Sequence, residues 1–207
     1  MSCTRTLSNE VILEALRCCR DVYPHEEDYL VSRKITGHTI LAVEGTKETT
    51  DWITNLKFLI RRDDCHRGFK NNANRTLAEL VVAYEGLDPK RKLVIAGHSL
   101  GGATATLIAD LLWDSGNKNV ALVTAGSPRP GGRRLRKRVK DLEHLRFVHG
   151  DDIGPGTPPW LAGYVHTHPA IKLKDADDTR FDGVADHNIG DYYDAAVKYY
   201  EEKKVTL

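Results

Sequence analysis

A serine set between glycines is the residue of this chain whose neighbours point most clearly to chemistry. Residues 97–101 read Gly-His-Ser-Leu-Gly, with Ser99 at the centre. An apolar, β-prone run at 92–96 precedes them, and a helix-forming run at 103–112 follows. A strand, a sharp turn and a helix around Gly-x-Ser-x-Gly are the setting of a nucleophile elbow, where glycines leave room for the turn. An incidental serine in a glycine-rich turn is the alternative, and the flanking elements favour a nucleophile.

The helix expected after Ser99 also bears on this chemistry. Its first turn offers backbone N–H groups and the positive end of the helix dipole beside the serine. Negative charge that develops on an attacked carbonyl oxygen would be stabilised there. One short segment is therefore predicted to supply both an attacking group and part of an oxyanion hole.

A serine hydroxyl is a poor nucleophile at neutral pH and needs a histidine base, which a carboxylate orients. In α/β-hydrolases these residues follow the chain order serine, acid, histidine. Asp151 and Asp152 come directly after an expected strand at 145–149, in a loop where such acids belong. Three other aspartates lie in or beside expected helices and are poorer candidates: Asp110, Asp114 and Asp141.

Chain order leaves three candidates for the base, namely His166, His168 and His187. His187 stands at the start of the last expected helix. The other two alternate about one threonine, so both could face one side of an edge strand. Chain order favours His187 without excluding the others.

Strands and helices are expected to alternate along the chain. Helices are predicted at 8–20, 49–56, 73–86, 103–112, 131–142 and 186–203, and strands at 38–44, 57–61, 92–96, 119–124 and 145–149. Residues 164–166 and 170–173 are expected to pair as edge strands, after a glycine- and proline-rich loop at 150–160. The alternation predicts an α/β fold with a mostly parallel sheet and helices on both faces.

Length and composition are those of an ordinary globular protein. The chain has 207 residues, 41% hydrophobic and 29% charged, with a net charge of +1, which predicts one domain over 1–207 and no nucleic-acid partner. No apolar run approaches the roughly 18 residues of a membrane span. Residues 1–10 lack an apolar signal core, so we expect an intracellular protein. The 4 cysteines lack metal-ligand spacing, and the serine chemistry needs no metal or organic cofactor.

Residues 133–140 form the most basic stretch of the chain. Such a helix could contact an anionic lipid surface. A solvated helix face balanced by acids elsewhere is the alternative, which the near-neutral total charge favours. Three further residues lie on or beside the expected site loops and are our candidates for lining a substrate pocket: Trp52, His98 and Trp160.

Several segments together resemble the class 3 (fungal-type) lipase family, in the family's order over about residues 35–200. The matching segments are 97–103 (Gly-His-Ser-Leu-Gly-Gly-Ala), 45–46 with 51–56, 66–69 (His-Arg-Gly-Phe), 124–129 (Thr-Ala-Gly-Ser-Pro-Arg), 152–159, 163–166 (Gly-Tyr-Val-His), and 186–187 followed by 192–193. Several matches in register are far more specific than any one alone.

The resemblance implies an α/β-hydrolase fold and gives roles to particular residues. It makes Ser99 the nucleophile, Asp152 the acid and His187 the base, and it makes His166 structural. The backbone N–H of Leu100 and that of Thr46, with the threonine hydroxyl, would form the oxyanion hole.

The chain also departs from the family pattern. Glu44 stands where the family usually has arginine, which reverses a charge near the oxyanion loop. Gly154 and Thr157 replace bulkier apolar residues, so we expect a wider or looser pocket there. Residues 46–56 are short and polar where family members often carry an amphipathic lid, which predicts a reduced or absent lid.

The expected function is that of a serine carboxylic-ester hydrolase, a lipase or esterase acting on lipid or acylglycerol esters through an acyl-enzyme. A phospholipase A1 or another acyl hydrolase is the nearer alternative, because head-group choice depends on loop shape. A non-catalytic lipid- or partner-binding protein that keeps the fold is the other.

Overall fold

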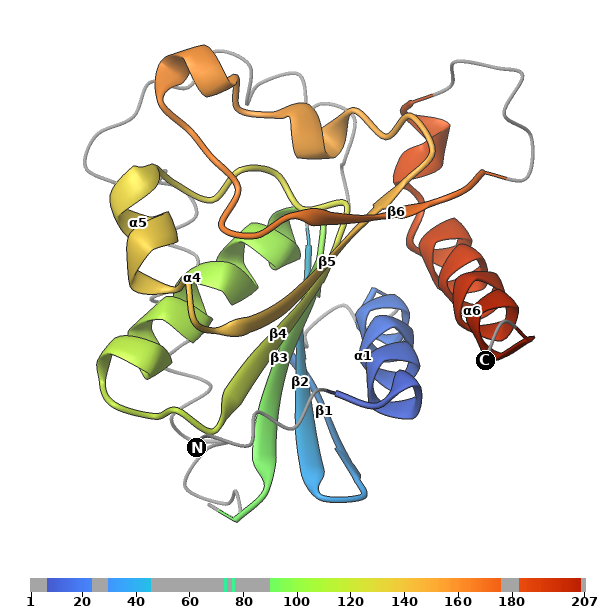
Figure 1. Cartoon of the computed structure of the whole chain (residues 1–207), viewed down its shortest axis with the longest axis horizontal. Helices are drawn as coiled ribbons and strands as arrows, with labels where there is room; N and C mark the ends of the chain where they lie inside the picture. Colours follow the sequence, from blue (N-terminus) through green and yellow to red (C-terminus); the bar gives the residue numbers. More distant parts are fainter. Residues whose placement is uncertain are drawn as a thin grey trace.

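A six-stranded sheet forms the centre of the computed structural model, with its strands in the order β1-β2-β3-β4-β5-β6 (Figure 1). The model describes residues 7–23, 30–45, 73, 76, 90–175 and 183–205. A hairpin joins β1 to β2 in antiparallel pairing, and every later neighbour pairs in parallel. The strands are β1 (Leu30–Ile35), β2 (His38–Val43), β3 (Lys92–His98), β4 (Val120–Ala125), β5 (Glu143–His149) and β6 (Ala170–Leu173).

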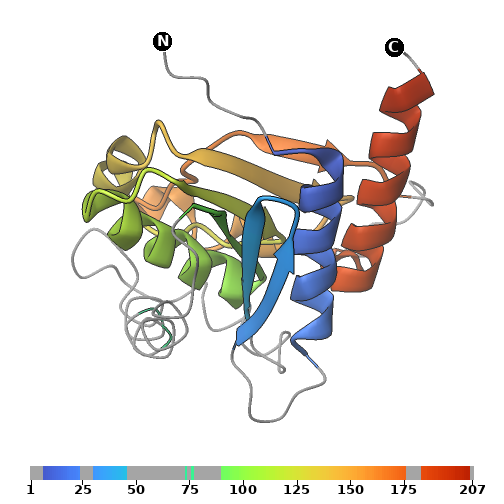
Figure 2. The same cartoon turned by 90° about the horizontal axis from the view of Figure 1, so that it is seen from below.

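Helices cover both faces of this sheet. One face carries α1 (Asn9–Asp21) and α6 (Ile189–Val205), which contact each other, and the other carries α4 (Leu100–Asp114) and α5 (Arg133–Arg138). The view in Figure 2 separates these two layers. The predicted α/β fold with a mostly parallel sheet is therefore confirmed.

Each strand contributes side chains to both layers, because successive side chains along a strand point to opposite faces of the sheet. In β2, Ile40 and Ala42 belong to the apolar cluster under α1 and α6, whereas Leu41 and Val43 belong to the cluster under α4. All four are buried. Such near-continuous apolar runs are expected when a parallel sheet is covered on both sides.

Polar contacts fix the helices at defined points. Ser8 caps α1, because its hydroxyl oxygen accepts a hydrogen bond from the Val11 N–H at 3.4 Å. A bidentate pair joins α5 to α4, with Arg138 Nε 2.9 Å from Asp110 Oδ1 and Arg138 Nη2 2.6 Å from Asp110 Oδ2. The fork of the guanidinium matches the carboxylate, which fixes the orientation of the short α5.

Three predictions about elements need correction. The helix expected at 131–142 is limited to α5, and strand β1 was not predicted at all. Residues 164–166 and 170–173 do not pair with each other: β6 lies parallel to β5, and Val165 bridges Gly131 instead.

Several expected elements fall outside the described residues. These are the helix and strand at 49–56 and 57–61 and most of the helix at 73–86, of which Ala73 and Thr76 are described as helical. Within the described ranges, no helix combines the length and apolar character that crossing a membrane requires.

We predict that α1 contributes to stability through its buried face. Leu16 is fully buried between α1 and the sheet, whereas Leu13 on the same helix is only partly buried. Leu16→Ala should lower the free energy of unfolding by about 3 kcal/mol, because it leaves a cavity. Leu13→Ala should cost clearly less. Urea unfolding measures both, and equal losses would contradict this packing.

Candidate active site

The turn between β3 and α4 holds Ser99 in a backbone conformation that side-chain-bearing residues seldom adopt. Its φ is 55° and its ψ is −129°, and it is the one non-glycine with positive φ among the described residues. Such strained conformations cluster at functional sites. Glycine is required on both sides: a Cβ on Gly97 would lie 2.3 Å from the Gly101 carbonyl oxygen, and one on Gly101 would lie 2.4 Å from that of Val43.

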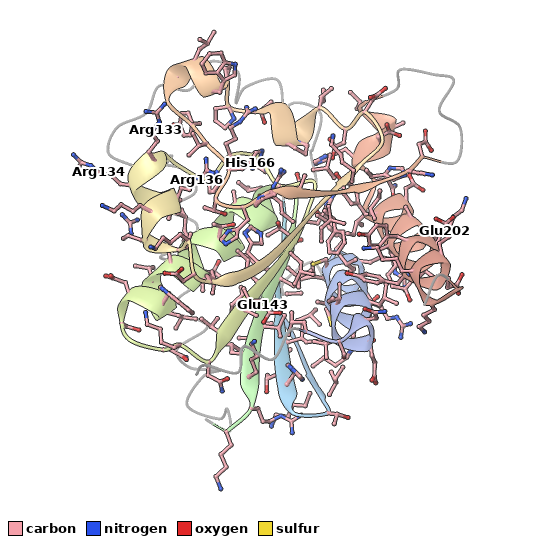
Figure 3. All side chains as sticks on the ribbon, viewed as in Figure 1. Arg133, Arg134, Arg136, Glu143, His166 and Glu202 are labelled. Carbon is pink, nitrogen blue, oxygen red and sulfur yellow. The ribbon has the colours of Figure 1, made fainter. Side chains whose placement is uncertain are left out.

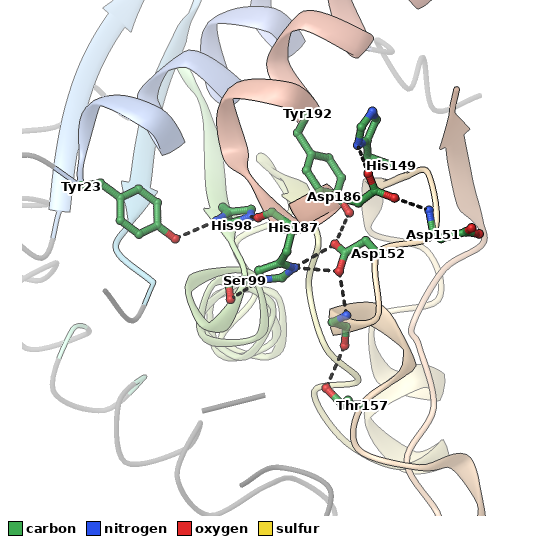
Figure 4. Close-up of polar contacts among 11 residues, drawn as sticks. Tyr23, His98, Ser99, His149, Asp151, Asp152, Thr157, Asp186, His187 and Tyr192 are labelled. Carbon is green, nitrogen blue, oxygen red and sulfur yellow. Dashed lines mark hydrogen bonds and ion pairs between the residues drawn. The ribbon is translucent and has the colours of Figure 1, made fainter. Parts of the chain in front are cut away.

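Three predicted residues meet beyond the carboxyl ends of the parallel strands (Figure 4). Ser99 follows β3, Asp152 follows β5, and His187 ends the short 3-10 helix η3 (Ala185–His187) before α6. The Ser99 hydroxyl lies 2.7 Å from His187 Nε2. His187 Nδ1 lies 2.8 Å and 2.9 Å from the two carboxylate oxygens of Asp152. The histidine can therefore accept the serine proton while the carboxylate fixes its tautomer.

Asp152 is held by two further donors. The Gly154 N–H donates to Oδ1 at 2.7 Å, and the Tyr192 hydroxyl, from α6, donates to Oδ2 at 2.6 Å. Burial first and the negative charge of Asp152 second raise the pKa of Tyr192 well above its usual value, so the hydroxyl stays protonated. The carboxylate therefore has little freedom to rotate away from His187.

His98 supports His187 instead of lining a substrate pocket, which corrects the sequence prediction. It is buried, and its Nε2 lies 2.8 Å from the backbone carbonyl oxygen of His187. Its Nδ1 lies 2.7 Å from the Tyr23 hydroxyl. Because a carbonyl only accepts, Nε2 carries the proton and Nδ1 accepts from Tyr23. Burial and the adjacent His187 ring keep the pKa of His98 well below its usual value, so the ring is neutral.

The other aspartate that the sequence proposed as the acid has a different place. Asp151 is exposed, and its backbone N–H donates to Asp186 Oδ2 at 2.7 Å. This bond joins the loop that carries Asp152 to η3, which carries His187. Asp186 in turn lies near the buried His149, with 3.9 Å between Oδ1 and Nδ1.

The other two histidines that chain order allowed lie away from the serine. His166 Nε2 lies 2.8 Å from the Pro155 carbonyl oxygen, and burial and the charge of Arg146 lower the pKa of His166 to about 3. His168 Nδ1 lies 3.3 Å from His144 Nδ1, at the amino end of β5 and so opposite the site. The geometry therefore selects His187 as the histidine beside Ser99.

One of the two predicted oxyanion donors lies within the described residues. Leu100 is the first residue of α4, where backbone N–H groups have no partner inside the helix. Thr46 and the expected lid at 46–56 lie outside the described residues. Ser99 exposes 0% of its surface, so an ester reaches its hydroxyl only after the covering atoms move.

The loop after the acid is tight where the sequence predicted a wider or looser pocket. A Cβ on Gly154 would lie 2.5 Å from His187 Cε1 and 2.7 Å from Nδ1. The Thr157 hydroxyl is buried and donates to the Gly154 carbonyl oxygen at 2.8 Å. The missing side chain at Gly154 thus lets the loop backbone contact the imidazole directly.

Of the two tryptophan candidates for a pocket, the structure describes one. Trp160 lies on the 3-10 helix η2 (Trp160–Ala162) and is 68% exposed, so the described residues do not enclose it in a pocket. Trp52 lies outside the described residues. Sequence reasoning missed the roles of Tyr23 and Tyr192. Only the position of Tyr192, shortly after His187 in the chain, could have indicated its role.

The fold and this arrangement can be compared with known proteins. The family model for class 3 lipases matches residues 40–162. The chain belongs to the class 3 lipase family. The structure of a Rhizomucor miehei lipase–propeptide complex is similar in fold, with a TM-score of 0.68 at 21% identity, over 89% of this chain and 81% of that one.

Two curated relatives of this class 3 lipase chain share more sequence. The secreted mono- and diacylglycerol lipase 1 of Fusarium solani is 34% identical over 156 residues, which are 70% of this chain and 46% of the relative. The lipase of Rhizomucor miehei is 31% identical over 160 residues, 69% of this chain and 44% of the relative. The chain thus spans about half the length of these relatives.

We predict that Gly154 sets the position of the His187 ring. Gly154→Ala should slow covalent labelling of Ser99 by a fluorophosphonate at least about tenfold, because displacing a catalytic group by an ångström can cost about 100-fold. Gly156 is the matched control: it belongs to the same 3-10 turn, and a Cβ there would meet nothing within 4 Å. Gly156→Ala should label like the parent, and an equal effect of both substitutions would contradict the prediction.

Proposed function

We propose that this class 3 lipase chain hydrolyses carboxylic esters of lipids, acylglycerols in particular. The observation that carries the proposal is the continuous set of hydrogen bonds from Ser99 through His187 to Asp152. A non-catalytic protein of this fold would have no need for a serine in a strained turn, bonded to a histidine in a fixed tautomer.

In the proposed reaction the Ser99 oxygen attacks the ester carbonyl carbon while His187 Nε2 takes the hydroxyl proton. The negative charge on the carbonyl oxygen is stabilised by the Leu100 N–H, with Thr46 as the second donor. His187 then gives the proton to the departing alcohol, which leaves an acyl group on Ser99. Water, activated by the same histidine, releases the fatty acid and restores the serine.

Asp152 orients His187 during this cycle. It stabilises the imidazolium form of His187 and holds Nδ1–H toward itself, so that Nε2 faces the serine. The bonds from Gly154 and Tyr192 keep the carboxylate in that orientation. Together with the His187 ring, these two donors replace the water that would otherwise solvate a buried carboxylate.

A lipid ester is presented in a micelle or membrane, so part of the protein must contact such a surface. We infer that the basic stretch at 133–140 contributes to that contact. An intracellular location and a single domain over 1–207 also stay predictions.

The substrate class can be tested with emulsified lipids. The parent protein should release fatty acid from mono- and diacylglycerols, and Ser99→Ala should be slower by at least about 10⁴-fold, because the nucleophile is missing. Titration of released acid measures both. Faster release from phospholipids than from acylglycerols would favour a phospholipase A1, and equal rates in the parent and Ser99→Ala would contradict the mechanism.

The base can be tested by comparing two histidines. His187→Ala should reduce hydrolysis of a soluble short-chain nitrophenyl ester by about as much as Ser99→Ala, because the residues act as a unit. His166→Ala should retain substantial activity, since the His166 ring contacts the Pro155 carbonyl oxygen, whereas His187 is the histidine bonded to Ser99. Circular dichroism checks that each variant is folded. An inactive, folded His166→Ala beside an active His187→Ala would overturn the assignment.

A further inference from the structure

Two large apolar side chains stand together in solvent at the tip of the loop beyond the acid. Trp160 is 68% exposed and Leu161 is 79% exposed, both on η2. Among the described residues the other exposed large apolar side chains are Leu111, at 41%, and Val184, at 51%, and each lies on a different segment. An adjacent, exposed Trp–Leu pair on an ordered turn costs solubility and therefore suggests an interaction.

The loop that carries this pair is fastened to the segment before α5. The backbone N–H and the guanidinium of Arg129 each donate at 2.6 Å, to the carbonyl oxygens of Thr157 and Pro158 respectively. On the far side of η2, the Val165 N–H donates to the Gly131 carbonyl oxygen at 2.7 Å. Both ends of the loop are thus bonded to residues 129–131, so η2 and the start of α5 form one unit.

Positive charge surrounds this unit. Arg133, Arg134, Arg136 and Lys137 all lie on α5 and are exposed, while Leu135 turns inward to the core. Within the part of the chain that the structure describes, no ion pair is found for these four residues. Figure 3 shows Arg133 at the end of α5 nearest η2, with Arg134 beside it. The surface thus combines an apolar tip with a cationic flank.

We propose that η2 and α5 form a docking surface for an anionic lipid–water interface, with Trp160 and Leu161 inserted among the acyl chains. This proposal rests on the proposed function, because it assigns the part of the protein that would bring the active site to its ester substrate. Amphipathic aromatic rings favour the boundary between headgroups and acyl chains, and arginines bind lipid phosphates. A nucleic acid would use the charge but not the exposed Trp160 and Leu161. We commit to a lipid surface and not to a protein partner, because the proposed substrate is itself part of such a surface.

The location of this surface links docking to the site. Gly154, which contacts the His187 ring, belongs to the same loop as η2. Insertion of η2 therefore brings the loop of the acid to the lipid boundary. The surface is made of described residues alone and does not depend on a lid.

The test measures binding in the Ser99→Ala background, so that it is independent of hydrolysis and leaves the vesicles intact. Vesicles of phosphatidylcholine, with and without phosphatidylglycerol, are sedimented with the protein. Replacing both Trp160→Ala and Leu161→Ser should weaken binding at least about tenfold. Replacing both Arg133→Gln and Arg134→Gln should weaken binding to the anionic vesicles about 25-fold, since each arginine near such a surface contributes a roughly fivefold factor.

Matched controls remove the same features elsewhere. Lys198→Gln with Lys204→Gln takes the same charge from α6, on the opposite face of the sheet, and Leu111→Ser removes an exposed apolar side chain from α4. Both should bind like the parent. A blue shift of fluorescence on binding that is lost in Trp160→Phe would locate the inserted ring, because Trp52 and Trp113 remain in that variant.

The outcomes separate docking from catalysis. Selective loss in the η2 and α5 variants supports the proposal, even if the parent hydrolyses no ester. Equal loss in the α6 control would mean unspecific charge attraction and would overturn it. Vesicle binding that no variant affects would overturn the proposal as well. A dimer that depends on Trp160, without vesicle binding, would also overturn it, because the surface would then bind another copy of the chain.

Discussion

The imidazole of His187 is the point on which the site depends, because it must face Ser99 and Asp152 at once. Its Nε2 lies 2.7 Å from the serine oxygen and its Nδ1 2.8 Å from the nearer carboxylate oxygen. These two contacts fix the ring plane, and the bond from His98 to the His187 carbonyl fixes the backbone behind it. The sheet and its helices make this geometry possible, because they bring together the ends of β3 and β5 and the start of α6.

Close backbone approach is the second constraint, and it explains why glycines recur around the site. Gly97 and Gly101 allow the elbow to fold against the end of β2, and Gly154 allows the acid loop to touch the imidazole. A side chain at any of these positions would require the backbone to move. The site is therefore assembled mainly from strand ends and tight turns, which hold side chains more rigidly than long loops do.

Much of this was predictable from the sequence, for identifiable reasons. An apolar, β-prone run precedes Ser99 and a helix-forming run follows it, with glycines at the turn, so the elbow and the α/β fold could be predicted. Chain order limited the candidates for the acid and the base, but it left three histidines for the base. The family resemblance was needed to choose His187 among them. The contacts now agree with that choice.

What the sequence did not reveal depends on three-dimensional contacts. His98 was expected at a pocket because it adjoins the nucleophile, yet its ring turns inward to Tyr23 and His187. Gly154 was interpreted as extra space, whereas the loop backbone fills that space itself. Trp160 was expected to line a substrate pocket and is 68% exposed, on a loop that two hydrogen bonds join to Arg129.

The central claim is that Ser99 is an activated nucleophile. It is tested most directly by treating the native protein with a fluorophosphonate and locating the adduct by peptide mass mapping. The account predicts a single adduct on the peptide that contains Ser99, and none after unfolding, because activation requires His187 beside the hydroxyl. A native protein that stays unmodified, or that is modified at another serine, would contradict the account.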